Sequence, residues 1–89
     1  MTRTELQQAA ESLRTAAEAA DDDEARERLQ AQAEKFDALA EAERGPDHGK
    51  LAHHEHILTE IAGDEPDAAE RIEAALESIH AYRETVEGV

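Results

Sequence analysis

The chain has 89 residues and no cysteine, and its 23 acidic against 9 basic residues give a formal net charge of −14. This length predicts a single domain over 1–89, and the missing cysteines exclude disulfides and thiolate zinc sites. The acidity excludes a basic nucleic-acid-binding surface and opposes contact with an anionic membrane. No apolar run resembles a signal peptide or a membrane span, so we expect a cytoplasmic protein.

The first expected helix covers residues 3–20. Thr2 with Glu5 and Thr4 with Gln7 have the spacing of a capping box, so either threonine is a candidate cap. Apolar residues follow at steps of three and four, which is the pattern of one buried helix face. They are Leu6, Ala9, Ala10, Leu13, Ala16, Ala17 and Ala20. Because only two of them are large, we expect this helix to be the loosest layer of the fold.

Three aspartates at 21–23 separate this helix from a second one, expected over 23–44. In a continuous helix, Leu29 would lie about 140° around the axis from Leu6, and the apolar face would change sides. A turn at the aspartates lets both faces meet in one core, and aspartate suits the start of a helix. The second apolar face consists of Ala25, Leu29, Ala33, Phe36, Leu39 and Ala40.

The segment 45–49 interrupts the helical pattern at the middle of the chain. Gly45 is expected to end the second helix in the left-handed conformation, and Asp47 is expected to cap the third. Gly49 lies in the first turn of that third helix, where it would allow another backbone to approach closely. A plain connection is the favoured interpretation of this segment, and a small binding loop with His48 at its tip is the alternative.

The last two helices are expected over 47–62 and 65–87, with Gly63 ending the third and Pro66 in the first turn of the fourth. Their apolar faces are Leu51, His54, Ile57, Leu58 and Ile61, then Ala68, Ile72, Ala75, Leu76, Ile79, Tyr82 and Val86. Four amphipathic helices with short connections predict an all-α, up-down-up-down four-helix bundle of two antiparallel helical hairpins. The thin core favours a homodimer through the third or fourth helix.

Four of the five histidines lie close together at 48–56. His54 falls on the apolar face, where a packed and hydrogen-bonded histidine is expected. His53, His56 and Glu60 fall on the opposite face at spacings of three and four, which can chelate a metal ion from one helix. Such spacings are common in polar helices, so no metal site is assigned, and metal binding by these residues, with or without His80, stays an open alternative.

Nothing in the chain has the pattern of an active site. Glu77 and His80 form one Glu-x-x-His match, but a di-iron bundle needs two matches and inward glutamates from other helices. Ser12 and Ser78 have no triad pattern around them, and no glycine-rich phosphate loop is present. Arg83 flanks the apolar face, where its stem is expected to cover neighbours. We therefore expect no enzyme, no catalytic or cofactor-binding residue and no cofactor.

Adaptation to high salt would also explain the acidic composition. Seven of the nine basic residues are arginine, and only Lys35 and Lys50 are lysine. A carboxylate-rich surface is tolerable where salt screens its repulsion, so the composition predicts the cytoplasm of a halophile. With segments 45–51 and 81–89 as its most distinctive parts, the whole chain resembles a family of short acidic haloarchaeal proteins of unknown function. The resemblance implies a halophilic source and carries no activity, cofactor or site residue.

These observations favour a non-enzymatic module that acts through protein–protein contact, with itself or with an unknown partner. One alternative is a bundle that binds a metal or small ligand weakly through the histidines of the third helix. Another is an acidic mimic of nucleic acid that binds a basic partner. Salt adaptation explains the same charge and ranks the mimic last.

Overall fold

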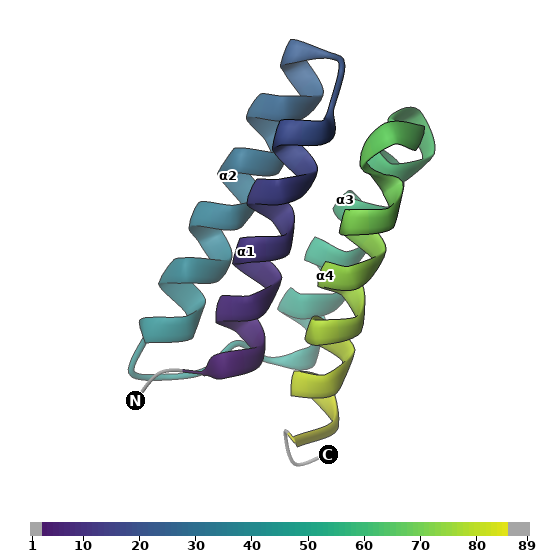
Figure 1. Ribbon diagram of the computed structural model, residues 1–89. Helices are drawn as coiled ribbons and strands as arrows, with labels where there is room; N and C mark the ends of the chain where they lie inside the picture. The colour runs from purple at the N-terminus through teal and green to yellow at the C-terminus, as the bar shows by residue number, and fades with distance from the viewer. Residues whose placement is uncertain (1–2, 86–89) are drawn as a thin grey trace.

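The computed structural model describes residues 3–85, which form four helices joined by short connections. They are α1 (Thr4–Ala19), α2 (Asp23–Glu41), α3 (His48–Asp64) and α4 (Pro66–Thr85). No strand occurs in that range, which confirms the predicted all-α class. In Figure 1, α1 lies between α2 and α4, and α3 lies behind α4. The helices contact one another as in a bundle: α1 packs on both α2 and α4, while α3 packs mainly on α4.

The core is narrow because small side chains fill much of it. Ten of the twenty buried apolar residues within 3–85 are alanines, and α1 alone contributes four of them beside its fully buried Leu6 and Leu13. The expectation that this first helix is the loosest layer is wrong. Alanine faces allow neighbouring helices to approach closely, so α1 becomes the central helix despite its few large side chains.

Two aspartates start helices, as predicted. The Asp22 carboxylate accepts a hydrogen bond from the backbone N–H of Ala25 at 3.0 Å, at the start of α2. The Asp47 carboxylate accepts from the backbone N–H of Lys50 at 2.7 Å, at the start of α3. Each bond satisfies one of the N–H groups that the first helical turn leaves unpaired. The break between α1 and α2 thus falls at the aspartates.

The predicted threonine cap of α1 is not found. Arg3 is the N-cap residue and makes no capping bond with its side chain, and Thr4 is already the first helical residue. Thr2 lies outside the described residues. The Arg3 side chain is occupied elsewhere, because it extends across to the end of α2.

α2 ends at Glu41, three residues before the predicted Arg44, because the chain turns extended at Ala42. The Arg3 backbone N–H donates to the carbonyl of Ala40 at 3.0 Å. The Arg3 guanidinium donates to the carbonyls of Ala42 at 2.6 Å and Leu39 at 3.2 Å, and more distantly to those of Ala40 and Glu43. A charged side chain therefore satisfies the carbonyls that a glycine cap was expected to tie off.

The glycines also differ from expectation. None of those within the described range has a positive φ, so the left-handed conformation predicted for Gly45 is wrong. Gly45 is nonetheless confined, since an added Cβ would lie 2.5 Å from Tyr82 Oη and 2.9 Å from Arg3 Nε. At Gly49 an added Cβ would meet only the Asp47 carboxylate, at an ordinary 3.5 Å. The close approach predicted at Gly49 is found instead at Gly45, and side chains make it.

One carboxylate links the α3–α4 connection to the α1–α2 connection at the same end of the bundle. α3 continues through Gly63 to Asp64, two residues beyond its predicted end, and α4 begins at Pro66. Between them, Glu65 Oε1 accepts hydrogen bonds from the backbone N–H groups of Asp21 at 2.9 Å and Asp22 at 3.4 Å. This contact ties the α3–α4 connection to the α1–α2 connection. The predicted extension of the last helix to 87 lies beyond the described residues.

Candidate functional site

Of the helix pairs that touch within residues 3–85, α2 and α3 meet at the fewest positions, and we call their contact the α2–α3 seam. A hollow of about 190 Å³ opens there, which we call the lysine cleft. Its lining consists of Lys35, Ala38 and Leu39 from α2 with Lys50 and His54 from α3. Both lysines of the chain therefore lie at one place. The sequence does not predict that the two lysines lie close together, because they are fifteen positions apart on different helices.

His54 forms the wall of the lysine cleft and is almost fully buried. Its Nδ1 lies 2.8 Å from Oε1 of Gln32, and its ring packs edge-on against Phe36 with centroids 5.2 Å apart. An amide oxygen only accepts hydrogen bonds, so the neutral ring carries its proton on Nδ1. The prediction of a packed, hydrogen-bonded histidine is confirmed. Its partner Gln32, three residues after Leu29 and four before Phe36, could have been found from that helical spacing.

Charge and burial act on His54 in the same direction. Burial, followed by the positive charges of His53, Lys35 and Lys50, lowers the pKa of His54 below its ordinary value. The unfolded chain therefore binds a proton at this residue more readily than the folded chain does. His54 contributes stability at neutral pH, where its ring is uncharged, and this contribution is lost in acid.

We expect the free energy of unfolding to fall as the pH drops below about 6.5, the ordinary pKa of histidine, because protonation of His54 then favours the unfolded chain. Urea unfolding at constant salt, between about pH 8 and pH 5, measures the slope. His54→Gln should flatten it, whereas His56→Gln, which changes an exposed histidine, should leave it intact. An equal slope in wild type and His54→Gln would assign the pH dependence to other groups.

A second polar cluster joins α3 to α4 around Glu55, whose side chain is 16% exposed. Its carboxylate accepts from Arg83 Nη1 at 2.6 Å and lies 2.8 Å from His80 Nε2. Arg83 Nε also donates to His48 Nδ1 at 3.2 Å. Sequence reasoning missed this cluster: Arg83 does more than cover apolar neighbours, and His80 pairs with a carboxylate. The cluster holds the open end of the second hairpin together.

The structure does not bring His53, His56 and Glu60 together around one point, as a shared metal ion would require. His56 Nε2 lies 3.5 Å from Glu60 Oε2, while the His53 ring lies edge-on to His54 with centroids 5.9 Å apart. Across residues 3–85, no group of three or more His, Asp or Glu side chains is placed to hold a metal ion. Glu77, from the Glu-x-x-His match, is exposed.

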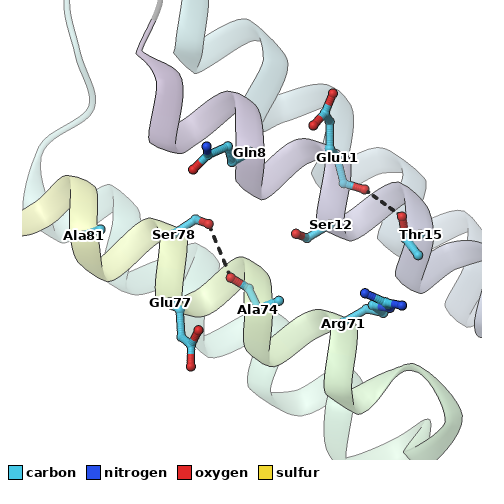
Figure 2. Close-up of a pocket in the computed structure, with 9 residues that line it drawn as sticks. All are labelled: Gln8, Glu11, Ser12, Thr15, Arg71, Ala74, Glu77, Ser78 and Ala81. Carbon is cyan, nitrogen blue, oxygen red and sulfur yellow. Dashed lines mark hydrogen bonds between the residues drawn. The ribbon is translucent and has the colours of Figure 1, made fainter.

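A shallow groove of about 540 Å³ lies between α1 and α4. Figure 2 shows that small and polar side chains line it, with Arg71 at one end. Ser78 Oγ donates to the carbonyl of Ala74 at 3.4 Å, and Thr15 Oγ1 donates to that of Glu11 at 3.2 Å. These hydroxyls serve the backbone of their own helices, and the groove presents exposed carboxylates beside small residues.

The chain matches a known protein family over most of its length. Residues 1–85 match the model of a protein family described as "Family of unknown function (DUF7553)". No curated protein and no solved structure matches the chain significantly. The described helices, taken over residues 3–85, include none with the length and apolar character needed to cross a membrane.

Proposed function

The chain belongs to DUF7553, a family of unknown function, and we propose from its geometry that it is a non-enzymatic interaction module that binds a second copy of itself. In this proposal the fold is an up-down-up-down bundle of two antiparallel hairpins. The observation that supports it is the position of α3, which packs mainly on α4 and leaves its side toward α2 poorly covered. A helix with one uncovered side is a natural surface for a twofold partner.

Both helices that border the seam have partly exposed apolar side chains. Leu39 of α2 and Ile57 of α3 pack against the core while staying partly exposed. Charge also favours α3 as the contact, because it has three acidic residues, against six in α2 and five in α4. Two copies that meet along α3 therefore bring fewer carboxylates together than two copies that meet along α4 would.

We expect the wild-type chain to have the mass of two chains by light scattering at molar salt, and Ile57→Glu to have the mass of one. The substitution places a carboxylate in the proposed apolar contact, where it must lose hydration without gaining a partner. Since Ile57 is only partly buried, the monomer should keep its helical circular dichroism spectrum.

Thr59→Glu is the matched control, because it adds the same charge to an exposed position of the same helix. It should leave the dimer intact. A wild-type mass of one chain at millimolar concentration would reject self-association. Equal dissociation by both substitutions would show that charge on α3, and not contact at the seam, controls assembly.

The composition supports a proposal about the setting as well. We propose that the protein works in the high-salt cytoplasm of a halophile, since a net charge of −14 on 89 residues needs screening. Arginine in place of lysine at seven of nine basic positions agrees with this setting.

A further inference from the structure

The lysine cleft is the one place where the scarce lysines gather in a strongly acidic chain. Lys35 and Lys50 are both exposed, and both border the same hollow. The whole chain has a net charge of −14 and few cations, so a local pair of ammonium groups is a feature suited to attract an anion. His54 adds no charge to the cleft at neutral pH, because its pKa is lowered by burial and by these lysines.

The rest of the lining is apolar. Ala38 and Leu39 come from the last two turns of α2, and Leu39 is only partly buried against the core. A ligand that contacted only the two lysines would leave the apolar lining exposed to water, whereas a ligand with an apolar body would bury it. The hollow, at about 190 Å³, is smaller than the 300–1,000 Å³ usual for drug-sized ligands, so a small molecule fits its scale.

We propose that the lysine cleft binds a small carboxylate with an apolar body, held by Lys35 and Lys50 at the carboxylate and by Ala38 and Leu39 at the body. The buried Gln32–His54 hydrogen bond, 2.8 Å long, fixes the wall behind the ligand and joins α2 to α3 there. The site lies along the same seam as the proposed dimer contact and shares Leu39 with it, so a second copy bound there would compete with the ligand.

Salt does not remove such an interaction. The screening length is roughly 3 Å at 1 M salt, which is close to the distance of a direct ammonium–carboxylate contact, so a contact pair survives where long-range attraction does not. Binding should therefore weaken between moderate and molar salt without disappearing.

Benzoate is the probe, and benzamide, which has the same shape without the charge, is its control. We expect benzoate to bind with a roughly millimolar Kd, as its few atoms allow, and to shift the backbone amide NMR signals of residues 35–39 and 50–54. Lys35→Gln and Lys50→Gln should each weaken binding about fivefold, because each removes one charge-assisted contact at an exposed position. The matched control Arg71→Gln removes an exposed cation from the distant α1–α4 groove and should leave the Kd unchanged.

Titration of Ile57→Glu separates this site from the proposed dimer. Benzoate binding by this variant supports the cleft whether or not the wild-type chain self-associates. Equal binding of benzamide, an equal loss of affinity in Arg71→Gln, or the absence of signal shifts at about 50 mM benzoate would each overturn the proposal.

Discussion

Dilution from about 2 M to about 0.01 M sodium chloride should unfold the protein, with loss of most of its helical circular dichroism. The screening length grows from a few Å to roughly 30 Å over this range. The molecule measures 38 × 21 × 16 Å, so at low salt most of its carboxylates repel one another across the whole fold. The opposing stability is small, about 0.05–0.15 kcal/mol per residue for ordinary domains, and the alanine-rich core places this chain at the low end.

A charge-reduced variant tests whether repulsion is the cause. Glu18, Glu27 and Glu73 are exposed and lie on α1, α2 and α4. Changing all three to glutamine should lower the salt concentration at the unfolding midpoint. Sucrose, which stabilises folded proteins by exclusion from their surface without screening, is the control for general salt effects. Full helicity and an unchanged melting temperature at 0.01 M salt would reject the screening argument.

Local sequence signals predicted the starts of α2 and α3, although not the cap of α1. Asp22 and Asp47 cap helices through N–H groups three residues away, so the bond lies within a short stretch of sequence. The helix ends were less predictable. Arg3 reaches carbonyls 36 to 40 residues away, and Glu65 reaches N–H groups 43 and 44 residues away. Such partners depend on the packed bundle, and no spacing rule in one helix contains them.

The candidate site shows the same limit. The apolar face correctly placed His54 in the core, but helical periodicity does not say which helices become neighbours. Leu39 was expected in the core, but it is only partly buried, and it lies on α2, which has little contact with α3. The gathering of Lys35 and Lys50 follows from that same arrangement. Periodicity predicted which side of each helix is buried, and the contacts between helices determine where the open seam lies.

Replacing Arg3 with methionine should destabilise the protein by about 2 kcal/mol, because hydrogen bonds from a charged donor to partly buried carbonyls contribute about 1.5–3 kcal/mol. Methionine keeps an apolar stem of similar length, so the loss reports the guanidinium. The stability of Arg3→Lys should lie between that of the wild type and that of Arg3→Met. An ammonium group keeps the charge but cannot reproduce the planar guanidinium that reaches Leu39, Ala42 and Glu43 together. Urea unfolding at molar salt gives the free energies, and urea is needed because guanidinium would itself screen the charges.

Arg44→Met is the matched control for Arg3→Met. Arg44 was the predicted last residue of the second helix, yet it is exposed and lies beyond the last helical residue, Glu41. Its replacement should change stability by less than about 0.5 kcal/mol. If both substitutions cost the same, the effect would come from loss of positive charge in an acidic chain. If only Arg3→Met destabilises, the N-terminal arginine is the residue that closes α2, and it joins the first and second helices where a glycine was expected to act alone.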